Sequence, residues 1–457
     1  MTYITETIVT SLQTILQPDQ ISTNVTVREL HGRDESYHAP ALPDVVVFPR
    51  STEDVSAILK IANDARIPVI PFGVGSSLEG HVIPTEGGMT MDFSEMNQIL
   101  DIQADDLLVR VQPGVTREQL NKALKKHGLF FSVDPGANAT LGGMAATNAS
   151  GTTAVKYGVM RDQVRDLEIV LANGDVIHTG SQASKSSSGL HLTGLFVGSE
   201  GTLGCITELT LRVYGIPEFE VAGRAVFTSI EDAVQAVVAI KQAGIDIGRV
   251  ELVDEASIKQ VNHFNSTEYT QQPTLFLEFQ GNEAGLEQDI DFATELLQDF
   301  GCTELQFEKD TAARHKLWEV RHGMAYAYIH SYPSKKLMST DVCVPISKLA
   351  DAINYARIEM DATDLIGGIV GHVGDGNFHA LLMIDMKVTD EVATAMKFNE
   401  KLVKFAIASG GTCTGEHGVG IGKRKYQEAE HGQALAVMKA IKSTLDPHNI
   451  MNPNKLY

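Results

Sequence analysis

Short apolar runs and amphipathic stretches alternate in the first half of the chain, and glycine-rich turns separate them. Three valines at 45–47 precede a helix-capping pattern and apolar residues at helical spacing within 51–62. Residues 116–127 show the same spacing and end at Gly128, a residue typical of the position after a helix. These patterns predict short strands and two clear helices between 45 and 215, after a polar lead-in with an early amphipathic helix.

The pattern changes after Pro217. An apolar run at 225–227 and the strand-like residues 249–252 flank an amphipathic stretch at 229–243, which predicts a strand, a helix and a strand. A second unit of the same kind begins in 275–300. We therefore expect a separate α+β lobe built on an antiparallel sheet.

Two histidines flank an Asp-Gly dipeptide at the end of this lobe. Strand-like runs surround them, and Asp375-Gly376 is a strong signal for a two-residue type I′ turn. Such a turn would place His372 directly opposite His379 on one sheet face, with Cβ atoms ~4.5–5.5 Å apart. The two imidazoles could then bind one metal ion. A register shift of one residue would instead put them on opposite faces.

Length and charge limit the class of protein. The chain has 457 residues, more than the roughly 250–300 at which single hydrophobic cores stop growing, so we expect two or three lobes. Its 37 Lys and Arg residues against 58 Asp and Glu residues give a net charge of −21. Such a surface repels phosphate backbones, which argues against nucleic acid as a partner. A small anionic substrate would need a local basic pocket.

The cysteines and the apolar runs bear on location. The four cysteines lack C-x-x-C, zinc-finger and iron–sulfur spacing, which is typical of free thiols in a reducing compartment. We see no secretory signal pattern and no run of about 18 apolar residues, so we expect no integral membrane segment. We therefore expect a cytoplasmic protein, with peripheral membrane association as an open alternative.

Three glycine-rich segments lie at 71–80, 134–151 and 196–204. Consecutive backbone N–H groups in the first segment could form a nest for phosphate oxygens, although an ordinary tight turn fits equally well. It is not a Rossmann fingerprint, because Leu78 stands where that motif needs glycine. In the second segment nearly every side chain is small, which suits either a large flat ligand or a closely packed helix start.

Together and in this order, the three segments resemble the FAD-binding domain of the vanillyl-alcohol-oxidase (PCMH-type) flavoprotein family. Later motifs narrow the resemblance to FAD-dependent, cytochrome-type D-lactate dehydrogenases and the glycolate oxidase D subunit. These motifs lie at 339–345, 372–379, 411–418 and 445–453.

The resemblance implies an α+β fold. A PCMH-type FAD-binding domain of two α+β subdomains, with the N-terminal lead-in, would span 1–217. An antiparallel-sheet α+β cap, the substrate domain, would span 218–410 and carry the histidine hairpin. The segment 411–457 would return to the FAD domain.

The resemblance also implies the residues that bind FAD. The first segment would hold the pyrophosphate, the later segments would line the rest of the cofactor, and Asn452 would return to the flavin. Some relatives bind flavin covalently through a histidine in the first loop. Residues 78–80 contain none, so we expect non-covalent FAD, although His81 lies just beyond. The expected contacts are Gly73, Gly75, Ser76, Ser77, Asp134, Thr140, Gly142, Gly143, Asn148, Gly151, Glu200, Gly201, Ile206 and Asn452.

A metal site would complete the chemistry. Catalytic metal sites often have about three protein ligands and an open position, and Glu416 is the natural third ligand beside the two histidines. The ligand set suits zinc or manganese. His417 would then accept the hydroxyl proton of a small 2-hydroxy acid whose hydride passes to flavin N5. The resemblance implies that Arg321 binds the substrate carboxylate.

The substrate, the function and the electron acceptor each have several possible identities. Leu381 and Ser339 stand where relatives that act on dicarboxylic acids tend to have polar groups, which favours D-lactate, although Lys335 or Lys336 could reach the substrate. The alternatives are a glycolate oxidase subunit, a D-2-hydroxyglutarate dehydrogenase or a catalytically silent flavin-binding subunit. The electron acceptor could be a cytochrome, a quinone or an electron-transfer flavoprotein.

Overall fold

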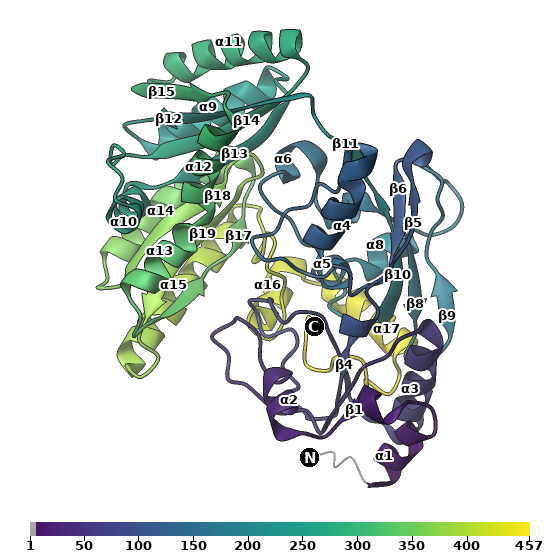
Figure 1. Cartoon of the computed structure of the whole chain (residues 1–457). Coiled ribbons are helices and arrows are strands. Elements are labelled where there is room, and N and C mark those ends of the chain that lie inside the picture. Colours follow the sequence, from purple (N-terminus) through teal and green to yellow (C-terminus); the bar gives the residue numbers. More distant parts are fainter. Residues whose placement is uncertain (1–5) are drawn as a thin grey trace. The chain divides into compact units, whose positions relative to one another are not determined.

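The computed structural model describes residues 6–457, so the first residues of the expected lead-in lie outside the described part. The chain divides into two compact units, each described by itself below (Figure 1). The first unit comprises the residues up to Ser150 together with 158–216 and 416–457, and the second unit comprises 151–157 and 217–415. That 1–217, 218–410 and 411–457 form separate domains stays a prediction.

The first sheet of the first unit is mostly parallel. Its strands β2, β4 and β3 run parallel, and β1 pairs with β2 in the antiparallel sense. The connection from β2 to β3 is α3 (Thr52–Ala65), and the Ser51 hydroxyl caps it by accepting the Asp54 N–H at 3.2 Å. The first predicted helix is therefore confirmed. The strand order is β1 (Ile21–Ser22), β2 (Val45–Val47), β4 (Met89–Asp92) and β3 (Val69–Phe72).

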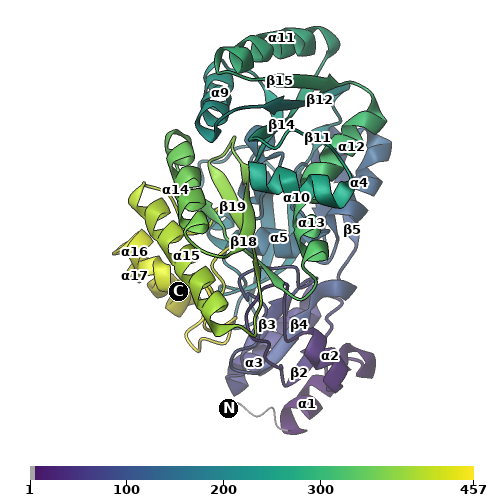
Figure 2. The same cartoon turned by 90° about the vertical axis from the view of Figure 1, so that its left-hand side faces the viewer.

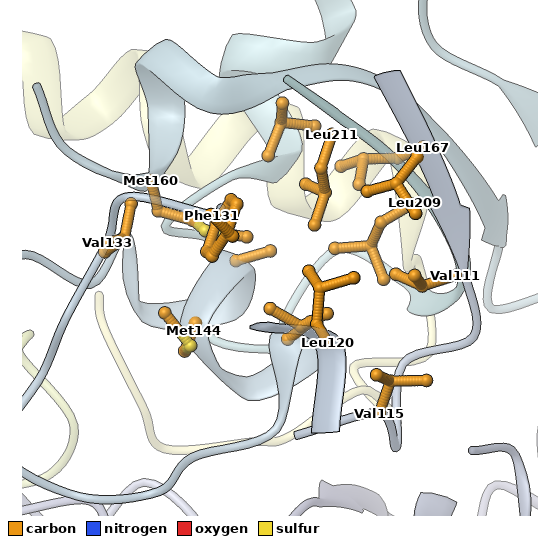
Figure 3. Packing of buried hydrophobic residues seen from close by; sticks show 14 of the residues in the cluster. Val111, Val115, Leu120, Phe131, Val133, Met144, Met160, Leu167, Leu209 and Leu211 are labelled. Atoms are coloured by element: carbon orange, nitrogen blue, oxygen red, sulfur yellow. The ribbon is translucent and has the colours of Figure 1, made fainter. Parts of the chain in front are cut away.

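The second sheet of this unit is antiparallel. Leu167 and Leu209 from the sheet pack with Phe131 and with Met144 of α5 (Leu141–Thr147) in a cluster of buried side chains (Figure 3). Each sheet with its helices forms one α+β subdomain, which confirms the predicted fold class. The strand order is β5 (Ile99–Gln103), β6 (Leu108–Val111), β10 (Cys205–Arg212), β8 (Val164–Val170) and β9 (Val176–His178).

The second predicted helix is also present as α4 (Arg117–Leu124), followed by a 3-10 turn over Lys125–His127. Gly128 comes next with a φ of 69°, in the left-handed region that glycine tolerates, as the sequence predicts. The other elements of the first unit are α1 (Glu6–Gln13), α2 (Val25–Leu30), β7 (Leu129–Phe130), α7 (Met160–Gln163), α8 (Leu192–Phe196), β11 (Tyr214–Gly215), α16 (Gln427–His431) and α17 (Ala434–Leu445).

The second unit is built on one antiparallel sheet, as predicted. β17 (Val342–Cys343) pairs with β19 beside the main path of the sheet. The order along that path is β15 (Glu304–Glu308), β12 (Phe219–Val226), β14 (Thr274–Gly281), β13 (Ile247–Val253), β18 (Ile366–His372), β19 (Asn377–Ile384) and β16 (Lys336–Ser339).

Helices pack against this sheet in two groups. α14 and α15 lie side by side and contact β19, as Figure 2 shows. α10 and α12 both contact α13, and their apolar side chains join a buried cluster with residues of β13, β14 and β18. The helices of this unit are α6 (Ala154–Tyr157), α9 (Ile230–Gln242), α10 (Glu255–Asn265), α11 (Glu283–Asp299), α12 (Thr311–His322), α13 (Met324–Ser331), α14 (Leu349–Asp361) and α15 (Thr389–Ala408).

The predicted turn of the histidine hairpin is wrong. His372 pairs with Asn377, so the loop comprises 373–376 instead of the dipeptide Asp375-Gly376. Of that dipeptide only Gly376 has a positive φ, 84°, whereas a type I′ turn needs positive φ at both residues. The register differs from the predicted one by two residues. An even shift keeps His372 and His379 on the same face, because side chains alternate with a period of two.

Contacts with a distant segment explain the longer loop. A Cβ atom on Gly376 would lie 2.0 Å from the carbonyl oxygen of Val344. The Val344 N–H in turn donates to the Gly376 carbonyl at 3.0 Å, and Cys343 pairs with Asn377. These tertiary contacts determine the path of the loop, and the local turn preference of Asp-Gly does not.

Among residues 6–457, no helix combines the length and apolar composition that crossing a bilayer requires.

A buried lysine connects the end of the chain to the rest of the first unit. Lys442 on α17 donates to the carbonyls of Thr202 and Met451 at 2.8 Å each and to the Asp446 carboxylate. Burial lowers the pKa of Lys442 in spite of the neighbouring Asp446.

We expect Lys442→Met to lower the free energy of unfolding by about 3 kcal/mol, because it leaves the Asp446 carboxylate buried without its cation. Urea unfolding of the FAD-loaded protein measures the change. Lys439→Met, at an exposed position of the same helix, is the control and should have little effect. Equal stabilities of the two variants would contradict this role for Lys442.

Candidate functional site

One face of the sheet in the second unit gathers three polar side chains. β13 and β18 pair Leu252 with Gly371, so continuing this register by one residue places Glu251 opposite His372. His379 follows Asn377, the partner of His372, by two residues and therefore lies on the same face. The two imidazole rings have centroids 5.5 Å apart and are nearly perpendicular, at 84°. The structure thus brings the predicted histidine pair together.

Hydrogen bonds at Nδ1 orient both rings. His372 Nδ1 lies 2.7 Å from the Glu251 carboxylate, and His379 Nδ1 lies 3.0 Å from the carbonyl oxygen of Thr340. Both partners can only accept, so each Nδ1 carries the proton. In a neutral imidazole of this tautomer, Nε2 has the lone pair that a metal ion needs. Nε2 is therefore the atom of each ring that could bind a metal ion.

Arg321 lies in the last turn of α12 and is buried. Its Nη2 donates to Glu251 at 2.5 Å, and its Nε has no hydrogen-bond partner among residues 6–457. A buried guanidinium with unused donors suits an anionic ligand. Burial raises the pKa of Glu251, but the charges of His372 and Arg321 outweigh that effect, so the pKa lies below its usual range.

A second buried carboxylate holds the loop that precedes Glu416 and His417. Asp341 accepts hydrogen bonds from Asn377 Nδ2 at 2.7 Å, the Thr414 hydroxyl at 2.6 Å and the Gly415 N–H at 2.9 Å. Gly415 lies so close to the hairpin that a Cβ atom there would meet Asn377 Nδ2 at 2.1 Å. Glu416 and His417 follow directly and begin the last segment of the first unit.

The first glycine-rich segment leaves β3 as a loop in the first unit. Among residues 6–457, no backbone N–H group from Val74 to Gly80 donates to another part of the protein. Residues outside the loop hold it. Asp34 accepts from the Ser77 hydroxyl at 2.9 Å, and the ring of Phe72 lies 2.9 Å from where a Cβ atom on Gly75 would be. Backbone N–H groups that the protein leaves without an acceptor on a fixed glycine loop fit the phosphates of a dinucleotide.

The second segment places small residues around the start of α5. Gly142 packs on Pro113, whereas a Cβ atom on Gly143 would meet only the Thr140 hydroxyl, at 3.1 Å. Asn148 ends the helix with a φ of 53°. The close packing of Gly142 fits the alternative of a packed helix start, and contact of this segment with a large flat ligand stays a prediction. Asp134, Gly73, Gly75, Ser76, Gly201 and Ile206 also belong to the first unit, and Gly151 belongs to the second.

The third segment and the chain end meet at Asn452. Its Nδ2 donates to the carbonyls of His81 and Glu200, at 3.1 and 2.7 Å, and its buried Oδ1 has no partner among residues 6–457. Glu200 accepts the N–H groups of Val419 and Gly420 and lies 3.3 Å from the His81 ring. The pKa of His81 is raised. Burial by itself would lower this pKa, but the negative charges near His81, chiefly that of Glu200, together have the larger effect.

The prediction missed two buried carboxylates, Glu251 and Asp341. Each had a signal in the sequence. Glu251 is a charged residue inside an apolar strand, and Asp341 lies in the motif at 339–345. A buried charge needs partners, but the sequence does not name partners that are 121 and 70 residues away, as His372 and Arg321 are from Glu251.

Comparison with known proteins identifies the family. The family described as FAD linked oxidases, C-terminal domain, matches residues 216–456, and the one described as FAD binding domain matches 43–180. A probable mitochondrial D-lactate dehydrogenase of Danio rerio is 47% identical over 99% of this chain and 92% of its own length. A mitochondrial D-lactate dehydrogenase [cytochrome] of Arabidopsis thaliana is 43% identical over 98% and 80%. Glycolate oxidase subunit GlcD of Bacillus subtilis is 33% identical over 99% and 97%.

Solved structures agree on the fold. p-Cresol methylhydroxylase matches with a TM-score of 0.83 at 18% identity, over 98% of this chain and 96% of that one. An alkyldihydroxyacetonephosphate synthase matches with a TM-score of 0.76 at 20% identity, over 99% and 85%. The predicted resemblance is confirmed. The chain belongs to the family of FAD-linked oxidases and is a flavoprotein oxidoreductase.

Proposed function

We propose that the protein is an FAD- and divalent-metal-dependent dehydrogenase that oxidises a small D-2-hydroxy acid, D-lactate to pyruvate. The observation that carries the metal is the pair His372 and His379, whose Nδ1 atoms both face acceptors. The relatives named D-lactate dehydrogenase support the substrate.

The residues fit both groups. The loop 74–80 offers unused N–H groups to the phosphates of FAD, and Asn452 Oδ1 is a buried acceptor without a partner among residues 6–457. Bound FAD would supply the hydride acceptor, its N5 atom. A divalent ion held by His372, His379 and Glu416 would supply a Lewis acid that lowers the pKa of the substrate hydroxyl. Glu416 is included because it is the residue after Gly415. The Gly415 N–H donates to Asp341, which holds this segment beside the hairpin.

Two side chains act on the substrate in this proposal. Arg321 binds the carboxylate through donors that Glu251 leaves unused. His417 takes the proton of the C2 hydroxyl as general base, for which imidazole suits neutral pH. The hydroxyl then loses its proton to His417 and C2 loses a hydride, so the hydroxy acid becomes a keto acid.

Residues of β16 and β19 next to His379 support a small substrate. Ser339 pairs with Leu381, two residues beyond His379 on the same face. Leu381 packs into the apolar cluster with Leu317 and Trp318, and Lys335 is paired with Glu391. These contacts favour a short apolar tail over a second carboxylate. Glycolate oxidation, supported by similarity to GlcD subunits, is the second candidate, and D-2-hydroxyglutarate is disfavoured.

We expect D-lactate to bleach the flavin absorbance faster than L-lactate, glycolate or D-2-hydroxyglutarate when each is mixed anaerobically with the metal-loaded protein. Glycolate as the fastest substrate would favour the second candidate. Failure of all four to bleach the flavin would overturn the dehydrogenase proposal and leave a silent flavin-binding subunit.

We expect His372→Ala to lose the bound metal and to lower kcat/KM by about a thousandfold, because Lewis-acid stabilisation contributes several kcal/mol. Elemental analysis and steady-state kinetics measure the two effects. His263→Ala, at an exposed position of α10, is the control. Full metal content and activity in His372→Ala would contradict the metal site.

We expect FAD to be bound non-covalently, because no histidine occupies 78–80. Acid precipitation should therefore release the yellow cofactor into the supernatant. Flavin retained in the pellet of the wild type and released from His81→Ala would instead show a covalent bond to His81.

A further inference from the structure

One buried carboxylate contacts both the predicted metal ligand and the predicted substrate anchor. Glu251 Oε1 accepts from His372 Nδ1 at 2.7 Å, and Oε2 accepts from Arg321 Nη2 at 2.5 Å. Its side chain is 1% exposed, so the carboxylate has exchanged water for these two donors. All three residues belong to the second unit, and the three elements that carry them, β13, β18 and α12, lie far apart in the sequence.

Stability alone does not explain this carboxylate. Its neighbours Val250, Leu252 and Val253 are buried apolar residues, and an apolar residue at 251 would avoid the cost of removing a charge from water. Buried ion pairs often contribute no more than well-packed apolar residues of similar volume. The arrangement has a different consequence: the positions of His372 and Arg321 both depend on the same rigid group.

We propose that Glu251 is a positioning residue that couples metal binding to binding of the substrate carboxylate. This inference rests on the function proposed above. One oxygen keeps the proton on His372 Nδ1 and orients the ring, which makes Nε2 a better metal ligand. The other oxygen holds Nη2 of Arg321 and leaves its remaining donors for the substrate. A metal ion that fixes His372 therefore also fixes Glu251 and Arg321, and the effect is reciprocal.

Glu251→Gln tests the coupling with little change of volume. Both partners are donors, and an amide offers only one acceptor oxygen, so the variant loses one of the two contacts. We expect the zinc affinity, measured by chelator competition on the FAD-loaded protein, to weaken roughly 10–100-fold if the His372 contact is lost. If the Arg321 contact is lost instead, the affinity for pyruvate should weaken by about tenfold or more, as measured by its perturbation of the flavin spectrum.

The chain offers a matched control. Glu278 on β14 is also buried and forms an ion pair with Arg249 at 3.2 Å, and within residues 6–457 it has no hydrogen bond or ion pair with His372 or Arg321. Glu278→Gln should leave both affinities within about twofold of the wild type. A loss in Glu278→Gln equal to that in Glu251→Gln would show a general effect of removing buried charge and would overturn the proposal.

Arg321→Met supplies a second measurement that does not require Glu251→Gln to fold. Arg321 is not a metal ligand in the proposed site, so a merely structural or substrate-binding role would leave the zinc affinity unchanged. We expect roughly fivefold weaker zinc binding, because Glu251 loses the donor that orients it toward His372. Unchanged zinc affinity in Arg321→Met, with unchanged zinc and pyruvate affinities in any folded Glu251→Gln, would overturn the coupling.

Failure of this inference is distinguishable from failure of the proposed function. If the wild type binds no stoichiometric zinc or manganese, or if His372→Ala keeps the metal, the metal site itself is wrong. If the wild type binds metal and His372→Ala loses it, but Arg321→Met keeps the zinc affinity and Glu251→Gln keeps both the zinc and the pyruvate affinities of the wild type, only the coupling is wrong.

Discussion

A carboxylate that is removed from water must be surrounded by donors, and this constraint organises the end of the sheet in the second unit. Glu251 and Asp341 are both buried. Together they accept hydrogen bonds from an imidazole, a guanidinium, an amide, a hydroxyl and a backbone N–H group. Each donor is thereby held in one place, because moving it would leave a buried charge without compensation.

The same constraint relates the packing to the chemistry proposed here. Glu251 lies on β13 between the buried residues Val250 and Leu252, and Asp341 lies directly before β17, so both carboxylates are held by the closely packed sheet. His372 and His379 are oriented through Nδ1 by groups that cannot move independently of the sheet. A metal ion at the proposed site would therefore require little reorganisation of its ligands.

In the first unit, the main feature is a backbone loop that a large cofactor could approach closely. Its loop at 74–80 leaves backbone N–H groups without protein acceptors among residues 6–457, which is costly unless water or a ligand accepts them. Two residues outside the loop hold it: Asp34 accepts from the Ser77 hydroxyl, and the ring of Phe72 lies against Gly75. Asn452 and Lys442 bind the end of the chain to the same unit, so residues distant in sequence complete one structure.

The sequence by itself determined the helices and strands with clear periodicity, the glycine-rich segments and the family, because each depends on local spacing or on motif order. It also identified the histidine pair, although by a turn that does not form. Tertiary structure decided the register of that hairpin, since Val344 occupies the space beside Gly376. It alone revealed Glu251 as the partner of His372 and Arg321. A buried charge makes partners necessary, but only the folded chain brings residues 121 and 70 positions apart within hydrogen-bond distance.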